Sequence, residues 1–74
     1  MKLPAISGKE CVKALTKANF YIRRQTGSHI IMRRDHPFSQ TTIPNHNIID
    51  KGTLRAILNQ CHITKEEFDS LLKS

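Results

Sequence analysis

The sequence has few of the residues that build a large core. Tryptophan is absent, and the 74 residues include one tyrosine and three phenylalanines. A chain this short buries only about 60% of the surface that its unfolded form exposes, so any active site is expected to be shallow. Hydrophobic residues still make up 38% of the chain, which suits a modest core and argues against a disordered segment. We expect one domain spanning residues 1–74.

Long apolar runs and clustered cysteines are also missing. No stretch approaches the roughly 20 apolar residues that cross a bilayer, and the opening residues MKLP lack the apolar stretch of a signal peptide. We therefore expect a cytoplasmic protein with no membrane partner. Cys11 and Cys61 fall in separate helical patterns, outside CxxC or Cys/His spacing. Buried thiols are expected there, with neither a metal site nor a disulfide.

Negative charge is scarce in the first half of the chain. The net charge is +6, yet three of the six acidic residues lie near the C-terminus. No acid stands between Glu10 and Asp35, where the cations are Lys13, Lys17, Arg23, Arg24, Arg33 and Arg34. Such an imbalance is typical of a surface that binds a polyanion. A basic surface that only keeps the protein in solution is the alternative.

Three helix starts can be recognised from capping residues. In a capping box, a hydroxyl side chain and a glutamate three residues later each accept a hydrogen bond from the other residue's backbone amide. Ser7 with Glu10, and Thr64 with Glu67, have this spacing, and each precedes an apolar stripe. Asp50 is the expected cap of a further helix between them.

The segment between the first two helices has the pattern of strands. Residues 20–25 and 29–34 predict a hairpin with a tight turn at Thr26-Gly27. Residues 35–40 are expected to form a polar loop, and a short third strand is expected at 41–43, because Pro44 cannot donate to a ladder. The order helix, three strands, helix, helix predicts an α+β two-layer sandwich with the helices on one face of an antiparallel sheet.

The second strand divides its side chains between two faces. Side chains alternate along a strand, so His29 and Arg33 are expected on one face. Ile30 and Met32 belong to the other, where they and Ile22 are expected to pack against the helices. The face that carries His29 is then left open to solvent.

That open face is the candidate site. Histidine takes and returns a proton near neutral pH, and guanidinium groups can hold a phosphodiester and stabilise the charge of its transition state. RNA supplies its own nucleophile, the 2′-hydroxyl, so the chemistry needs neither a metal nor another cofactor. The residues considered for RNA binding are Arg23, Arg24, Arg33, Lys51 and Arg55. From the local pattern alone, a single histidine after a turn is more often a surface or structural residue than a catalytic one.

The other polar candidates have two interpretations each. His46 is either an auxiliary residue of the site or a hydrogen bonder that fixes its loop. Lys51, Thr53 and Arg55 either bind phosphate through backbone amides and cationic tips at a helix start, or belong to the solvated surface. One arginine of the pair 33–34 must point toward the helices, where only its tip is expected to reach water.

Four segments resemble the HicA toxin family of bacterial and archaeal toxin–antitoxin systems. They occur in order within residues 5–72 and read SGKECVKALTKANF, GSHIIM, TTIPNH and DKGTLRAILNQ. The resemblance implies a fold like a double-stranded-RNA-binding domain, α-β-β-β-α, here with an additional short C-terminal helix. It also implies an RNA endonuclease that cleaves messenger RNA without a metal and is inhibited by a HicB antitoxin.

The resemblance also implies roles for particular residues. His29 occupies the position of the catalytic histidine in the family's GSH motif. Gly27 permits the turn before it, and Ser28 either caps the turn or contacts phosphate. His46 lies in the second motif, in which individual roles are not assigned. Residues 45–49 are less basic than the corresponding loop of many members, which weakens the case for a phosphate clamp there.

Three rival functions remain. A non-catalytic module could bind RNA by shape and phosphate contacts alone, and a toxin homologue that has lost activity could persist as an interaction partner. A helix-turn-helix for DNA is disfavoured, because its recognition helix would begin with Lys65-Glu66-Glu67, whose acids would face phosphates.

Overall fold

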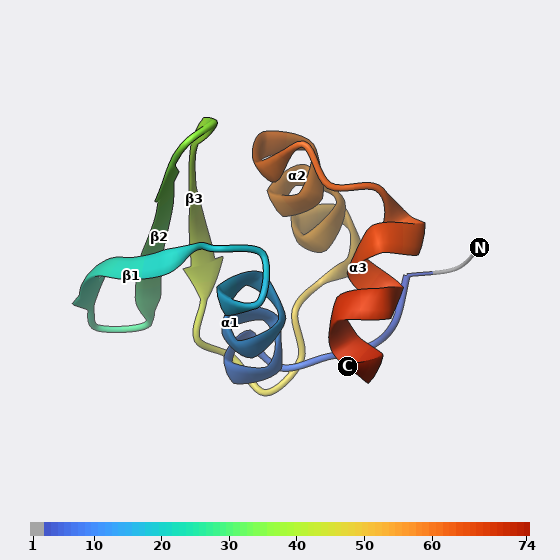
Figure 1. Cartoon of the computed structure of the whole chain (residues 1–74). Helices are drawn as coiled ribbons and strands as arrows, with labels where there is room; N and C mark the ends of the chain where they lie inside the picture. Colours follow the sequence, from blue (N-terminus) through green and yellow to red (C-terminus); the bar gives the residue numbers. More distant parts are fainter. Residues whose placement is uncertain (1–2) are drawn as a thin grey trace.

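The computed structural model describes residues 3–74 and has three helices and three strands (Figure 1). In chain order they are α1 (Gly8–Thr16), β1 (Tyr21–Thr26), β2 (His29–Asp35), β3 (Phe38–Pro44), α2 (Lys51–Cys61) and α3 (Lys65–Lys73). The strands form one antiparallel sheet in the order β1-β2-β3. The predicted α+β arrangement, with its additional C-terminal helix, is confirmed.

The helix starts lie where the capping residues predict them. The Ser7 hydroxyl accepts from the Glu10 amide at 3.1 Å, and Glu10 accepts from the Ser7 amide at 3.0 Å. Thr64 and Glu67 form the same reciprocal pair at the start of α3. Asp50 caps α2. Each box satisfies amides that an uncapped helix would leave without partners.

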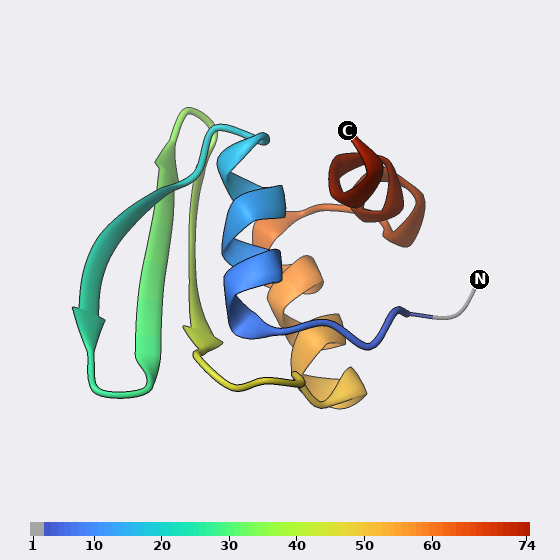
Figure 2. The same cartoon turned by 90° about the horizontal axis from the view of Figure 1, so that it is seen from below.

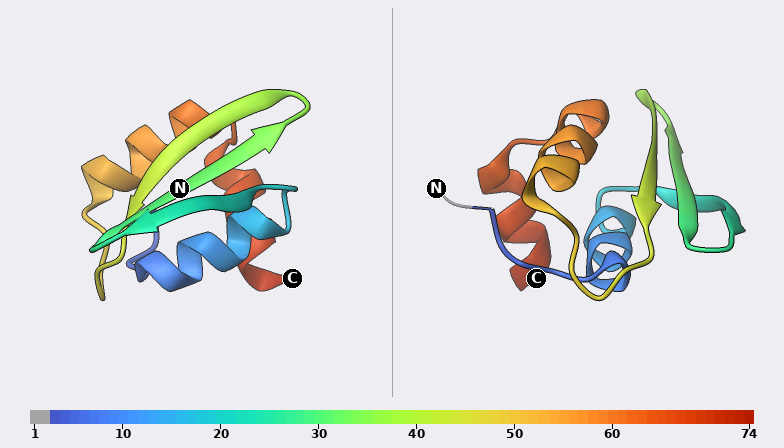
Figure 3. Two further views of the ribbon diagram at one scale, coloured as in Figure 1. Left: turned by 90° about the vertical axis from the view of Figure 1, so that its left-hand side faces the viewer. Right: turned by 180° about the vertical axis from the view of Figure 1, so that it is seen from behind.

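All three helices lie on one side of the sheet, and the opposite face is bare (Figures 1 and 3). Ile30 and Met32 of β2 and Ile43 of β3 point to the helical side and are buried. They join Leu15 of α1 and Leu54 of α2 in the core. A fully buried side chain of this size contributes about 1.5–3 kcal/mol relative to an exposed one, so this layer holds the sheet against the helices.

The edge strand β1 departs from the prediction. Ile22 pairs with Met32 and so lies on the helical side, yet 49% of its surface is exposed. Every residue of β1 is exposed, because the strand curves away from the helical layer (Figure 2). The expectation that Ile22 packs against the helices is therefore wrong.

The third strand is longer than its sequence suggested. It begins at Phe38, so the expected loop at residues 35–40 shrinks to a turn at His36-Pro37. The reason is that Ser39 and Thr41 take inward positions, where their small hydroxylated side chains are buried under the helices. The Thr41 hydroxyl donates to Gln60 Oε1 of α2 at 2.6 Å. Residues 38–40 were expected to be a loop because they include polar residues, although their side chains alternate between the two faces of the sheet.

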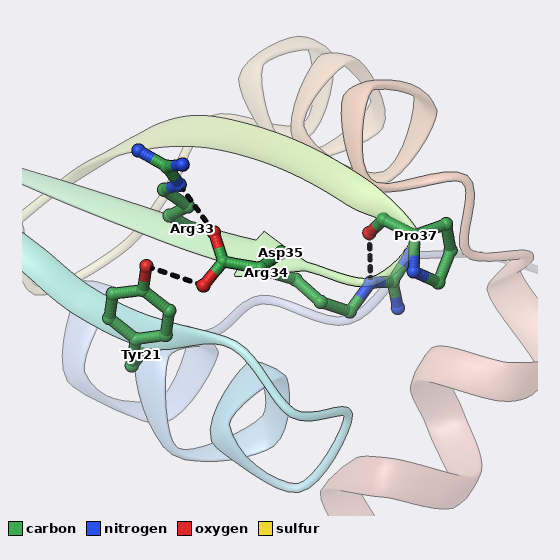
Figure 4. Close-up of polar contacts among 5 residues, drawn as sticks. All are labelled: Tyr21, Arg33, Arg34, Asp35 and Pro37. Carbon is green, nitrogen blue, oxygen red and sulfur yellow. Dashed lines mark hydrogen bonds and ion pairs between the residues drawn. The ribbon is translucent and has the colours of Figure 1, made fainter.

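Arg34 is the arginine of the 33–34 pair that points toward the helices. Its guanidinium lies 4.6 Å from the ring centroid of Phe20. It donates to the carbonyl oxygen of Pro37 at 3.1 Å (Figure 4). It also donates to the carbonyl oxygen of Cys61 at 3.3 Å, with a longer contact of 3.5 Å to that of Ala18. Besides lying on the helical side as expected, the guanidinium joins the ends of α1 and α2 to the β2–β3 turn.

Candidate active site

The GSH segment forms the tip of the β1–β2 hairpin. Gly27 has φ +52 and open space around the position of a Cβ, so glycine is needed there for backbone conformation and not for room. His29 follows as the first residue of β2, opposite Thr26 on β1 and Pro44 on β3. It is exposed, and the alternation of β2 places it on the bare face of the sheet. The predicted placement of His29 is confirmed.

The loop that carries His46 is held against this tip by backbone contacts. The Asn45 amide donates to the Ser28 carbonyl at 2.7 Å, and the Gly8 amide donates to the His46 carbonyl at 2.9 Å. A Cβ on Gly8 would lie 2.3 Å from the Pro44 carbonyl oxygen, so the start of α1 is packed directly on the loop. The structure therefore brings the GSH turn and the His46 segment together.

His46 fixes its loop through its backbone and not through its ring. No side-chain hydrogen bond of His46 occurs within residues 3–74, and the residue is exposed. Its imidazole is thus available to a ligand at the end of the sheet that carries His29. The interpretation of His46 as a side-chain hydrogen bonder gains no support from the described residues.

The arginines of β1 lie nearer to His29 than Arg33 of β2 does. Arg24 pairs with Ile31 and so shares the bare face, two residues along β2 from His29. Arg23 is the extra residue of a bulge between Ile22 and Arg24, and both arginines are exposed. Arg33 stands four residues from His29, about 13 Å at the 3.3 Å rise of a strand. The three arginines considered for RNA binding are therefore spread along the sheet and do not surround His29.

Arg33 also has an acid to balance it. Its Nε donates to Asp35 Oδ1 at 2.8 Å, and its guanidinium lies 5.2 Å from the ring centroid of Phe38. The Tyr21 hydroxyl donates to the second oxygen of Asp35 at 3.0 Å (Figure 4). This hydrogen bond, followed by that from Arg33, holds the pKa of the Asp35 carboxyl below its usual value, and the same bond raises the pKa of Tyr21.

The start of α2 offers cations but few free amides. The Asp50 carboxylate accepts from the amides of Gly52 at 3.1 Å and Thr53 at 3.4 Å. The Asp50 carboxylate therefore occupies two of the backbone amides that were expected to bind phosphate at this helix start. Lys51 and Arg55 are exposed, and the first turn of α2 lies at the same end of the molecule as the β1–β2 turn (Figure 2). The cationic tips of Lys51 and Arg55 are therefore accessible to an anionic ligand, while two amides of the helix start are occupied.

The two thiols are buried in the core. Burial raises the pKa of Cys11 from 9.0 to about 12 and that of Cys61 from 9.0 to about 11. Residues 3–74 contain no group of three or more His, Cys, Asp or Glu side chains placed to hold a metal ion. Among the same residues, no helix is both long enough and apolar enough to cross a membrane.

The sequence was compared with known protein families, with curated proteins and with solved structures. The family model described as HicA toxin of bacterial toxin-antitoxin matches residues 8–63 of the 74-residue chain. The chain belongs to the HicA toxin family. Comparisons with curated proteins and with solved structures find no match.

Membership in the HicA family makes this chain the toxin of a toxin–antitoxin pair. The matched region runs from the first residue of α1 to the residue before the cap of α3 and includes both the GSH turn and the His46 loop. All of α3 lies outside it. Lys17, the C-cap residue of α1, donates to the carbonyl oxygens of Leu71 and Ser74, which ties α3 to the family region.

Three residues of the bare face were missed by sequence reasoning. Tyr21, Asp35 and Phe38 were assigned to a strand or a loop without any role in the site. Extending the alternation of β2 to residue 35, and starting β3 at residue 38, would have placed all three beside Arg33.

Proposed function

We propose that this HicA toxin is a metal-independent endoribonuclease that cleaves messenger RNA, with His29 as the proton-transfer residue. The observation that carries the proposal is the position of His29. It is exposed on the bare sheet face, directly after the Gly27 turn, and the His46 loop is bonded to the adjacent Ser28 carbonyl. A rigid hairpin holds an imidazole where a strand of RNA can reach it.

The chemistry requires only groups that the chain and the RNA supply. The His29 imidazole accepts the proton of a 2′-hydroxyl, whose oxygen then attacks the adjacent phosphorus. The bond from phosphorus to the 5′-oxygen breaks, giving a 2′,3′-cyclic phosphate on one product. The departing 5′-oxygen takes up a proton, for which protonated His46 is the proposed donor.

Phosphate binding is assigned to the cations at the same end of the sheet. Arg24 and Arg23 would hold the phosphodiester and stabilise its additional charge in the transition state, because guanidinium groups donate in a planar fork. The Ser28 hydroxyl is a further donor beside His29. Lys51 and Arg55 would contact flanking phosphates by their side chains, since Asp50 occupies the amides of the helix start.

Cleavage of a labelled RNA in EDTA tests the proposal. Wild type should cut, and His29→Ala and His29→Gln should lose at least about a hundredfold in rate, in line with the usual contribution of a general acid or base. RNA binding should persist in both variants, because His29 is not one of the cationic contacts. If wild type binds RNA but all three proteins fail to cut, the chain is an RNA-binding module or a silent toxin.

The partner proposed for this toxin is a HicB-type antitoxin that covers the His29 end of the sheet. Family membership already requires an antitoxin. An antitoxin that blocks the site should protect His29 from modification by diethyl pyrocarbonate in the complex. Unchanged modification of His29 in the complex would place the antitoxin elsewhere.

A further inference from the structure

The bare sheet face carries a second feature at the end away from His29. Two aromatic rings are exposed there, Phe38 with 61% and Tyr21 with 43% of its surface accessible. Tyr21 on β1 pairs with Arg33 on β2, and Phe38 on β3 pairs with Asp35 on β2. Tyr21, Arg33 and Phe38 are called the aromatic patch below.

The arginine in the patch is held in a fixed orientation. Asp35 accepts from Arg33 Nε at 2.8 Å, and the guanidinium lies 5.2 Å from the Phe38 centroid. No other hydrogen bond of the Arg33 side chain occurs within residues 3–74, and 32% of the side chain is exposed. Figure 4 shows its two terminal nitrogens without a bonded partner among the residues drawn. A planar cation and a ring thus stand together on an open surface.

The acid beside the patch does not repel an anionic ligand strongly. Both oxygens of Asp35 are engaged, one by Arg33 and one by the Tyr21 hydroxyl. Its charge is compensated within the cluster. Arg24 lies on the same face opposite Ile31, the next outward position of β2 after Arg33, so the patch adjoins a cationic stretch.

We propose that the aromatic patch is a stacking subsite for unpaired nucleobases of the RNA substrate. Bases of single-stranded RNA stack on aromatic rings and on arginine planes, and the patch offers both kinds of surface. This inference rests on the proposed function, because it extends the same substrate along the sheet. Asp35 lies six positions along β2 from His29, about 20 Å at 3.3 Å per residue, so the bound base lies several nucleotides from the cut.

Single-stranded RNA suits the patch better than a protein partner does. The chain carries a net charge of +6. Arg23 and Arg24 are exposed on β1, the strand that also carries Tyr21 of the patch. Phosphates between the stacked base and His29 would pass over this cationic stretch. A protein partner would instead be expected to meet a broader apolar surface than two rings separated by an arginine.

Binding of two matched oligomers tests the proposal in the His29→Gln background, where cleavage cannot interfere. One probe is a single-stranded oligouridylate, and the other is an abasic ribose phosphate of equal length and charge. Phe38→Ala should weaken binding of the oligouridylate about 5- to 150-fold, the range of one lost stacking contact. It should leave binding of the abasic probe unchanged.

Two further variants and one signal refine the test. Phe38→Trp should retain affinity, because it keeps a ring, and Ile48→Ala is the control for loss of an exposed apolar side chain away from the patch. The chain has one tyrosine and no tryptophan, so fluorescence of Phe38→Ala and of the parent comes from Tyr21 alone. Quenching by the oligouridylate and not by the abasic probe is expected.

The outcomes separate this inference from the ribonuclease itself. If wild type cleaves RNA but Phe38→Ala binds both probes as tightly as its parent, the ribonuclease stands and the stacking subsite is wrong. If base-dependent binding is lost in Phe38→Ala although wild type cuts no RNA, the subsite stands without the catalytic role. Equal losses with both probes would overturn stacking and point to altered phosphate binding.

Discussion

Gly27 sets the direction in which His29 leaves the hairpin turn. Its φ of +52 lies in the left-handed region, and nothing surrounds the position of a Cβ. Gly27→Ala should therefore lower the free energy of unfolding by about 1–2 kcal/mol through backbone strain alone. Gly27→Asn should cost less, because asparagine tolerates this region better than alanine does. Urea unfolding of both variants measures the difference, and equal stability of all three proteins would contradict the strain argument.

Arg34 differs from the other arginines of the strands because its role is structural. Removing its side chain leaves the carbonyls of Pro37 and Cys61 without their donor and uncovers the Phe20 ring. We expect Arg34→Ala to lose about 2–3 kcal/mol of unfolding free energy, as for hydrogen bonds to a charged group. Arg24→Ala is the control, and its exposed side chain should contribute less than about 0.5 kcal/mol. A similar loss in both variants would show that the Arg34 contacts do not hold the elements together.

At the scale of elements, the start of α1 and the His46 loop depend on each other. Alanine favours a helix over glycine by about 1 kcal/mol, but a Cβ on Gly8 would lie 2.3 Å from the Pro44 carbonyl oxygen. Forcing atoms into a packed site costs about 1–3 kcal/mol, so Gly8→Ala should be destabilising and should displace the loop. Gly52→Ala is the matched control, since its Cβ would meet only the Asp50 carboxylate at 3.2 Å. Thermal unfolding of the two variants and of wild type tests this prediction. A Gly8→Ala variant more stable than wild type would contradict it.

The elements that the sequence predicted well are those fixed by local chemistry. The caps at Ser7, Asp50 and Thr64 satisfy amides within three residues, so their signals are contained in short segments. The start of β3 was missed because its first inward residue, Ser39, is polar and yet buried. Ile22 is apolar and yet exposed. Its exposure was missed because no local pattern predicts that β1 curves away from the helices.

At the scale of the whole molecule, the candidate site was predictable in its parts and not in its arrangement. The GSH turn and the face of His29 follow from alternation along one strand. Two sets of contacts join segments that lie apart in the sequence. One is the hydrogen bond between Asn45 and Ser28, and the other links Asp35 to Arg33 and Tyr21. No sequence pattern predicts that these segments lie close together in space. The sequence therefore did not show how the cations are spread along the sheet, nor the contacts that Arg34 makes with the helices.

The core thiols make the stability of the whole fold sensitive to alkali. The folded pKa of Cys11 is raised from 9.0 to about 12, so the folded state keeps a proton that the unfolded state loses above pH 9. Stability is thus fully present below pH 9 and declines toward pH 12, by at most about 1.4 kcal/mol per pH unit from this group. Cys11→Ala should show a shallower decline between pH 9 and pH 11 in urea unfolding. Parallel curves for the two proteins would contradict this assignment.

The net charge of +6 should make RNA binding depend steeply on salt, and the slope reports which cations meet phosphate. For single strands, each phosphate that a protein neutralises contributes about 0.7 to the slope of log K against log salt. Arg24→Ala removes a cation exposed on the bare face, so it should reduce the slope by about that amount. Arg34→Ala removes the same charge from the helical side, where carbonyl oxygens already hold it, and should leave the slope unchanged if the protein remains folded. Titrations of oligouridylate across a series of salt concentrations, in the His29→Gln background, compare the two. Equal reductions would mean that overall charge, and not the bare face of the sheet, determines binding.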